Sequence, residues 1–224
     1  MCTVSYLPLG DADFILTSNR DENPKRKTLA PQEYNDEGVL LTYPKDEVAG
    51  GTWIGLSEKK RLICLLNGGL KNHVRAKSYR LSRGVIVKQF LKVGGVVAYA
   101  KEIDLNNIEP FTIVLVDWED QLKVYELVWT GIEKRFQELE NKPHIWSSST
   151  LYTEEMKQLR SNWFSDWLLD REEFLQQDIV AFHSDDTIGT TDTSLKMKRE
   201  RVETVSITSV VKKKEKVSME YLDF

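Results

Sequence analysis

The sequence predicts an α+β fold in one domain over residues 1–224, with largely antiparallel sheets and helices packed against them. Three observations indicate this class. Segments rich in β-branched and aromatic residues come in pairs separated by short turns, which is typical of hairpins. The helical segments cluster between those pairs rather than alternating with single strands. Hydrophobic residues make up 41% of the 224-residue chain and charged residues 29%, which is the composition of a globular domain.

The first 70 residues contain two predicted hairpins. Their strands are expected at residues 3–9 and 13–18, and at residues 52–57 and 61–67. The glycine pairs Gly50-Gly51 and Gly68-Gly69 bracket the second hairpin. Residues 19–47 between the two hairpins are polar and contain proline, so we expect a long loop that forms part of a site.

The rest of the chain supplies the helices and further strands. Apolar residues at helical spacing predict helices at residues 78–92 and 96–102, and two more within residues 152–182. Strands are expected at residues 111–118, 122–128, 203–210 and 217–224. The lysine-rich segment 212–216 joins the last two as a solvated turn.

Composition excludes several classes of function. The 31 basic and 35 acidic residues give a net charge of −4, so the sequence predicts neither nucleic-acid binding nor attraction to an anionic membrane. We find no apolar run near the roughly 20 residues that span a bilayer, and no secretory signal. The two cysteines are too few for a disulfide framework, so we expect a cytoplasmic protein. The three histidines lack metal-ligand spacing, so no metal and no cofactor is expected.

Three short stretches stand at the ends of predicted strands. Cys2 precedes the first strand, Arg20 and Asp21 follow its hairpin partner, and Asn67 ends the fourth strand. An antiparallel hairpin brings the start of one strand beside the end of the next, so Arg20 and Asp21 are expected near Cys2. The same order of hairpins would let Asn67 face this edge.

These residue types fit acyl transfer. Removal of Met1 would expose Cys2 with a free α-amino group, whose pKa of about 7.7–8.0 allows it to act as a base for the thiol. The Arg20 guanidinium would favour the thiolate, and Asp21 could orient the α-amino group. Asn67 could stabilise an oxyanion with its amide. The expected reaction is acyl transfer from an amide, with water resolving the acyl-enzyme.

Each feature also has a structural interpretation. A cysteine at the start of a strand, such as Cys2, is more often an inert, small buried residue. Residues 19–22 fit a charged turn in which Arg20 pairs with Glu22, and Asn67-Gly68 is an ordinary turn dipeptide. Cys64 lies within an apolar strand and is assigned to the core.

Taken together, these stretches resemble a known family. Asn19-Arg20-Asp21-Glu22 is the motif that names the NRDE proteins, also called the transport and Golgi organisation protein 2 family. The remaining pieces occur in the family's order: Met1-Cys2, the GGTWIG stretch 50–55, Leu66-Asn67, and the SRG stretch 82–84. The resemblance is clear over about residues 1–95.

Members of this family resemble N-terminal nucleophile hydrolases of the cholylglycine hydrolase and penicillin V acylase type, a four-layer αββα sandwich. The resemblance implies Cys2 as nucleophile and base, Arg20 and Asp21 beside it, and Asn67 as the first oxyanion donor. Ser148 stands where the family has a second oxyanion asparagine, and its hydroxyl offers one shorter donor. The residues assigned to substrate binding are Asn19 and Trp53. The family's YGTR-like stretch corresponds to residues 188–191, which lack the arginine.

Two functions follow from these expectations. The first is hydrolysis of a non-peptide carboxamide, a small-molecule amide, through Cys2. The second is a non-catalytic binding or trafficking role for a hydrophobic ligand such as haem or a lipid. Six tryptophans could line an apolar pocket for such a ligand, although core packing explains most of them: Trp53, Trp118, Trp129, Trp146, Trp163 and Trp167.

Overall fold

The computed structural model describes residues 3–169 and 171–224, and the chain divides into two compact units. The terminal unit comprises residues 1–25 and 142–224, and the central unit comprises residues 26–141. Each unit has its own sheet and its own pair of helices among the described residues, and each is described by itself below. The expectation of one domain over residues 1–224 stays a prediction.

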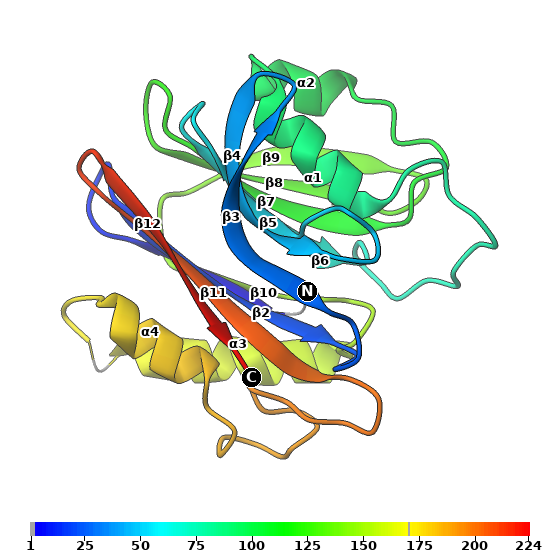
Figure 1. Ribbon diagram of the computed structural model, residues 1–224. Coiled ribbons are helices and arrows are strands. Elements are labelled where there is room, and N and C mark those ends of the chain that lie inside the picture. The colour runs from blue at the N-terminus through cyan, green and yellow to red at the C-terminus, as the bar shows by residue number, and fades with distance from the viewer. Residues whose placement is uncertain (1–2, 170) are drawn as a thin grey trace. The chain divides into compact units, whose positions relative to one another are not determined.

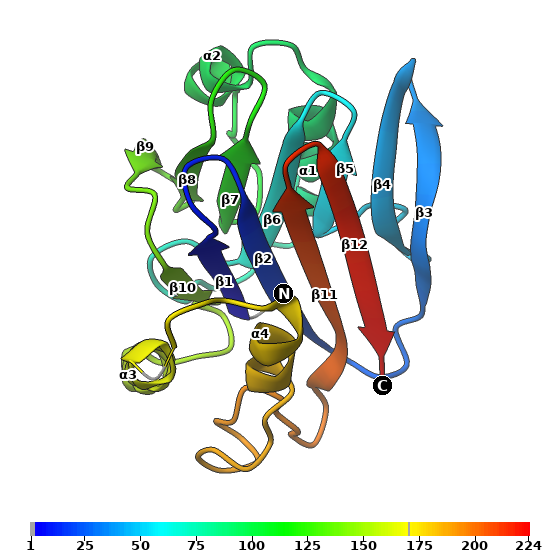
Figure 2. The same cartoon turned by 90° about the vertical axis from the view of Figure 1, so that its left-hand side faces the viewer.

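The described part of the terminal unit contains a five-stranded antiparallel sheet in the order β10-β1-β2-β11-β12. Its strands are β1 (Thr3–Pro8), β2 (Phe14–Glu22), β10 (His144–Ser147), β11 (Glu203–Lys213) and β12 (Lys216–Asp223). Figure 2 shows the strands side by side in this order. The helices α3 (Glu154–Leu169) and α4 (Gln176–His183) pack on this sheet, with α3 against β10 and α4 against β2 and β11 (Figure 1).

Apolar side chains join the sheet to its helices in the terminal unit. Leu7 on β1 and Ile15 on β2 are buried in one cluster with Phe164 of α3 and with Ile179 and Phe182 of α4. The strands alternate side chains between the two faces, so one apolar set per strand reaches the helices. This cluster fixes the two helices over the sheet.

The central unit contains a seven-stranded antiparallel sheet in which the strands follow chain order, β3-β4-β5-β6-β7-β8-β9. The strands are β3 (Thr28–Asp36), β4 (Val39–Asp46), β5 (Ile54–Ser57), β6 (Arg61–Asn67), β7 (Phe111–Asp117), β8 (Lys123–Trp129) and β9 (Lys134–Leu139). Its helices are α1 (Arg83–Lys92) and α2 (Val96–Glu102), and both lie over one face of the sheet (Figure 1). The Ser82 hydroxyl caps α1 by accepting from the Val85 N–H at 3.4 Å.

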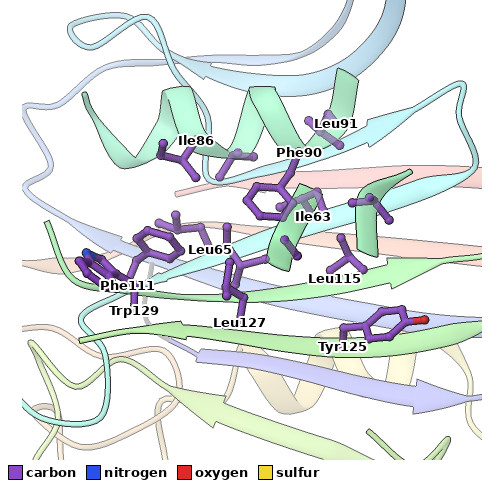
Figure 3. Close-up of a cluster of buried hydrophobic side chains, with 14 of the residues drawn as sticks. Ile63, Leu65, Ile86, Phe90, Leu91, Phe111, Leu115, Tyr125, Leu127 and Trp129 are labelled. Carbon is purple, nitrogen blue, oxygen red and sulfur yellow. The ribbon is translucent and has the colours of Figure 1, made fainter. Parts of the chain in front are cut away.

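The core of the central unit lies between α1 and the middle strands. Figure 3 shows Phe90 of α1 directed toward Ile63 of β6 and the strands beside it. Ile63, Phe90 and Leu115 are at most 1% exposed, and all three belong to one buried cluster. The almost continuous apolar run of β7 thus forms a central strand, as the sequence predicts.

The expectation of a long loop at residues 19–47 was wrong. Residues 28–46 form the β3–β4 hairpin, which turns at Glu37 and Gly38, both with positive φ. The hairpin was hidden because β3 is an edge strand with mostly exposed residues, so it lacks an apolar face. Its Pro31 lies where the β3–β4 register shifts, a position where an edge strand tolerates proline.

Smaller differences also have physical causes. The strands β9 and β10 were missed because β9 is charged and β10 has only four residues. The helix expected from residue 78 begins at Arg83, after the Ser82 cap. Lys212 is not a solvated turn residue: it is 7% exposed within β11, and its Nζ lies 2.7 Å from the carbonyl oxygen of Ala12 and 3.1 Å from Asp13 Oδ1.

The α+β class with antiparallel sheets is confirmed. The predicted core position of Cys64 is confirmed too, because that side chain is 0% exposed. Trp129, Trp163 and Trp167 pack in or against the apolar clusters. Among the described residues, no helix combines the length and the apolar character that crossing a membrane would require.

Candidate functional site

The predicted site residues fall in both units. Asn19, Arg20 and Asp21 lie near the end of β2, and Ser148 follows β10, all in the terminal unit. Asn67 ends β6 in the central unit, where Trp53 immediately precedes β5. Cys2, the expected nucleophile, lies outside the described residues.

The start of β1 is the point around which the terminal-unit residues gather. Thr3, the first described residue, pairs with Asn19 of β2 on one side and with Ser147 of β10 on the other. Arg20 and Asp21 follow the first partner, and Ser148 follows the second. The hairpin logic of the sequence therefore predicted correctly that the end of β2 lies beside the start of β1.

The NRDE motif divides between the two faces of the sheet. Asn19 and Asp21 point to the helix-covered face. There Asn19 binds the backbone of residues 183 and 195, and Asp21 binds the side chains of residues 152 and 204. Arg20, which lies between them on the strand, points to the opposite face. All three side chains are at most 3% exposed. The motif is thus a buried strand end and not a charged turn.

Asn19 ties β2 to the end of α4. Its Nδ2 donates to the carbonyl oxygens of His183 at 2.9 Å and Leu195 at 2.8 Å, which fixes the orientation of the amide. Its Oδ1 is therefore directed at His183 Nδ1, which must carry the ring proton. The other ring nitrogen, Nε2, accepts from the Ser5 hydroxyl at 2.7 Å. The result is a buried Ser5–His183–Asn19 chain with one tautomer.

The imidazole in this chain is neutral. Burial, and secondly the positive charge of Arg160, lower the pKa of His183 from its ordinary 6.5 to about 3. Ser5, Asn19 and His183 are all 0% exposed, so no substrate reaches this serine and histidine. The chain therefore holds β1, β2 and α4 together and is not itself a catalytic triad.

Asp21 has two hydroxyl partners. Tyr152 donates to Oδ2 at 2.5 Å, and Thr204 of β11 donates to Oδ1 at 2.6 Å. The Tyr152 ring lies under the Arg160 guanidinium, whose Cζ is 3.6 Å from the ring centroid. The hydroxyl of Tyr152 therefore contacts a carboxylate, while the face of its ring contacts a buried cation.

Arg160 of α3 reaches the start of β1. Its Nη1 donates to the Thr3 hydroxyl at 2.5 Å, and its Nη2 donates to the carbonyl oxygen of Ser194, also at 2.5 Å. Nε and Nη2 each donate to the carbonyl oxygen of Thr193 at 3.2 Å. The side chain is 0% exposed.

The serines after β10 offer hydroxyls where the family resemblance leads us to expect an amide. Ser148 is 1% exposed, and its Oγ lies 3.0 Å from Thr150 Oγ1. Ser149 is 6% exposed, and its Oγ has no hydrogen-bond partner within the part of the chain that the structure describes. Of these two, only the Ser149 hydroxyl is uncommitted.

In the central unit, Asn67 is half-buried at the end of β6 and pairs with Phe111 of β7. Trp53 is 6% exposed, and its carbonyl oxygen accepts from the Leu65 N–H at 2.8 Å. Two glycines of the family motifs also meet here: a Cβ on Gly84 would lie 3.1 Å from Gly51 Cα.

Sequence reasoning missed Tyr152, Arg160 and His183. Their partners on β1 and β2 are 131 to 178 residues away in the chain, so no local spacing marked them. The one available signal was an arginine among the apolar positions of a predicted helix. Among residues 3–169 and 171–224, no three His, Cys, Asp or Glu side chains cluster as metal ligands.

Comparison with known proteins adds a family and a fold. A family model described as Transport and Golgi organisation 2 matches residues 1–221. An uncharacterized protein of Saccharomyces cerevisiae is 34% identical over 88 residues, an alignment that covers 37% of this chain and only 28% of the yeast protein.

Two solved structures resemble this chain over more than nine-tenths of its length. A Caenorhabditis elegans orthologue of N-acylethanolamine-hydrolyzing acid amidase has a TM-score of 0.62 at 12% identity, covering 93% of this chain and 92% of that one. A variant of conjugated bile acid hydrolase from Clostridium perfringens has a TM-score of 0.54 at 10% identity, covering 99% and 92%. The N-terminal nucleophile hydrolase fold predicted from the sequence is confirmed.

Proposed function

This chain belongs to the Transport and Golgi organisation 2 family, and from that premise we propose that it is an N-terminal cysteine hydrolase acting on a non-peptide carboxamide. Cys2 accepts the acyl group, and water then releases it as a carboxylic acid. The two cysteines are too few for a disulfide framework, which fits a reducing compartment, and we propose that the protein acts in the cytoplasm.

One observation carries this proposal: the surroundings of Thr3, the residue to which Cys2 is bonded. Thr3 lies between two strand ends, one bearing Arg20 and Asp21 and the other followed by Ser148. Consecutive Cα atoms are about 3.8 Å apart, and we propose that these groups serve the residue bonded to Thr3. The end of β2 thus carries a cation on one face of the sheet and a carboxylate on the other, and we propose that Arg20 acts on the thiol and Asp21 on the α-amino group.

The chemistry uses each group once. After removal of Met1, the α-amino group takes the thiol proton, and Sγ attacks the amide carbon to form a tetrahedral oxyanion. Arg20 favours the thiolate, and Asp21 orients the α-amino group. Asn67 and Ser148 are the proposed oxyanion donors. Collapse breaks the C–N bond, the amine leaves with the proton, and water hydrolyses the Cys2 thioester.

The neighbours suggest which substrates to try first. One is an orthologue of an N-acylethanolamine-hydrolyzing acid amidase, and the other is a variant of a conjugated bile acid hydrolase. We therefore propose small molecules in which an acyl group is joined to an amine. An N-acylethanolamine, a conjugated bile acid and the activated ester p-nitrophenyl acetate make a first set of probes.

The test compares wild type with Cys2→Ala and with Cys64→Ala, which removes the core cysteine instead. The amino-terminal residue is determined first, by intact mass. We expect Cys2 at the terminus, an acyl adduct on Cys2 from the ester, and product release by wild type and Cys64→Ala but not by Cys2→Ala. Complete retention of Met1, no adduct on Cys2, or equal turnover by Cys2→Ala would overturn the proposal.

A second candidate is a non-catalytic binding protein for haem or a lipid, and one observation favours it. The Ser148 hydroxyl lies within hydrogen-bond distance of Thr150 and stands where the hydrolases of this type have an amide. Loss of one oxyanion donor typically costs about 10²–10³ in turnover. Tight binding of haemin or a fluorescent fatty acid by both wild type and Cys2→Ala, without turnover by either, would support binding over catalysis.

A further inference from the structure

We propose that Arg160 is a positioning residue that sets the start of β1, holding Thr3 directly and Asp21 through Tyr152. The inference rests on the proposed function, because it concerns the geometry around Cys2. It assigns a role to a residue on α3 that no local motif marks.

The first step is the unusual environment of the guanidinium. Arg160 is fully buried, yet among the described residues no carboxylate forms an ion pair with it. A buried cation without a counter-ion is costly, and apolar side chains would fill the same volume more favourably. The arginine is balanced instead by the hydroxyl and carbonyl oxygens of residues 3, 193 and 194 and by the face of the Tyr152 ring.

The second step is the choice of partners. The planar guanidinium has donors in a fixed fork, so binding the Ser194 carbonyl with Nη2 fixes the direction of Nη1. Nη1 is then directed at Thr3 Oγ1, one residue after Cys2. A purely structural clamp between α3 and residues 193–194 would not need the Thr3 hydroxyl, which also makes that bond the sharpest point to test.

The third step links the same arginine to the carboxylate. Arg160 stacks on Tyr152, and the Tyr152 hydroxyl donates to Asp21 Oδ2 at 2.5 Å. The cation over the ring makes the phenol a stronger donor, and the bond fixes one oxygen of Asp21. Thr3 and Asp21, which lie on neighbouring strands, are therefore held by one side chain from α3.

The experiment uses full-length protein and p-nitrophenyl acetate, whose acyl transfer to Cys2 forms a thioester and releases p-nitrophenolate. The variants are Thr3→Val, which replaces only the hydroxyl with a methyl group, Tyr152→Phe and Arg160→Lys. Arg171→Lys is the matched control, because Arg171 also stacks on an aromatic ring, with its Cζ 4.1 Å from the Trp167 ring centroid, but donates to the Trp167 carbonyl oxygen at 2.8 Å rather than to β1. The acylation rate constant and the KM are measured from pH 6 to 9, together with the thermal midpoint.

We expect Thr3→Val and Arg160→Lys to lower the acylation rate constant about tenfold, with KM within about twofold, since small displacements of a reacting group reduce rate more than affinity. Tyr152→Phe should shift the pH profile, and Arg171→Lys should match wild type. If Thr3→Val remains folded and acylates at the wild-type rate, the inference about Arg160 is wrong, whether or not Arg160→Lys folds. The proposed function is unaffected by that result. If wild type itself forms no acyl-Cys2, both the inference and the proposed function are wrong.

Discussion

Gly84 and Gly51 meet backbone to backbone in the central unit. A Cβ added to Gly84 would lie 3.0 Å from both the nitrogen and the oxygen of Thr52 and 3.1 Å from Gly51 Cα. The two glycines come from separate motifs of the sequence, GGTWIG and SRG. Both motifs therefore place glycine where the start of α1 approaches the segment before β5 so closely that a Cβ would lie 3.0–3.1 Å from backbone atoms.

The first prediction concerns this contact. Gly84→Ala should lower the free energy of unfolding by about 1–3 kcal/mol, because the backbone atoms of Thr52 cannot move aside as a flexible side chain would. Gly94→Ala is the control, since a Cβ there would meet nothing within 4 Å. Urea denaturation compares the two. Equal free energies of unfolding for Gly84→Ala and Gly94→Ala would show that the start of α1 can move away from Thr52 without cost.

The sequence was informative where a pattern is local. The β1–β2 hairpin was predicted because β-branched and aromatic residues flank a glycine-containing turn, and the register of these strands follows from the turn. The β5–β6 hairpin was predicted because glycine pairs bracket two β-rich runs joined by a short charged turn. The β3–β4 hairpin was missed because an exposed edge strand carries no apolar alternation. Even so, its Glu37-Gly38 turn was a signal that could have been used.

The candidate site was predictable only in part. That Asn19, Arg20 and Asp21 would lie at a strand end beside the start of β1 followed from hairpin geometry. That Asn19 and Asp21 would turn away from Arg20 and bind partners from residues 152–204 did not follow. Those partners are joined by contacts spanning 131 to 183 residues, which depend on how α3, α4 and β11 pack on the sheet.

The second prediction tests Asn19. In Asn19→Asp the Nδ2 donor becomes an oxygen that faces the carbonyl oxygens of His183 and Leu195. Two hydrogen bonds are replaced by repulsion in a fully buried place, so the free energy of unfolding should fall by about 3–5 kcal/mol. Asn23→Asp, at an exposed position where the side chain only accepts, should leave it unchanged. Chemical denaturation at pH 7 measures both, and similar values for the two variants would contradict the buried role.

The third prediction concerns pH. The pKa of His183 is lowered to about 3 in the folded chain and is near 6.5 when unfolded, so the unfolded state binds more protons between these values. The contribution of the neutral imidazole to stability is therefore complete above about pH 6.5 and is lost as pH falls toward 3. Between these two pH values, the free energy of unfolding falls by about 1.4 kcal/mol for each pH unit through this group.

The comparison uses His183→Gln, which keeps hydrogen-bonding atoms but does not titrate. Between pH 6.5 and 5, wild type should lose about 2 kcal/mol more of its unfolding free energy than the variant does. Carboxylate titration affects both proteins alike and cancels in the difference. Parallel stability curves for the two proteins over this range would show that His183 is protonated in the folded state.

The last prediction concerns Arg61, which like Arg160 is fully buried and which binds the end of α1. It is 0% exposed, and its guanidinium donates to the carbonyl oxygens of Phe90 at 3.3 Å, Val93 at 2.8 Å and Gly94 at 3.0 Å. These carbonyls belong to the last turn of α1 and the residues after it, where helical partners are missing. Asp117 Oδ2 lies 3.4 Å from Nε and partly offsets the charge.

Arg61→Lys keeps the positive charge but replaces the fork with one ammonium group, which cannot reach carbonyls on different sides of the helix end. We expect the free energy of unfolding to fall by about 2–4 kcal/mol and amide exchange at residues 90–94 to accelerate. Arg135→Lys, at an exposed pair with Glu133, is the control and should leave the denaturation midpoint unchanged. If the Arg61 variant instead matched that control, charge alone would account for the stabilisation of α1, because the lysine retains the charge and loses only the geometry.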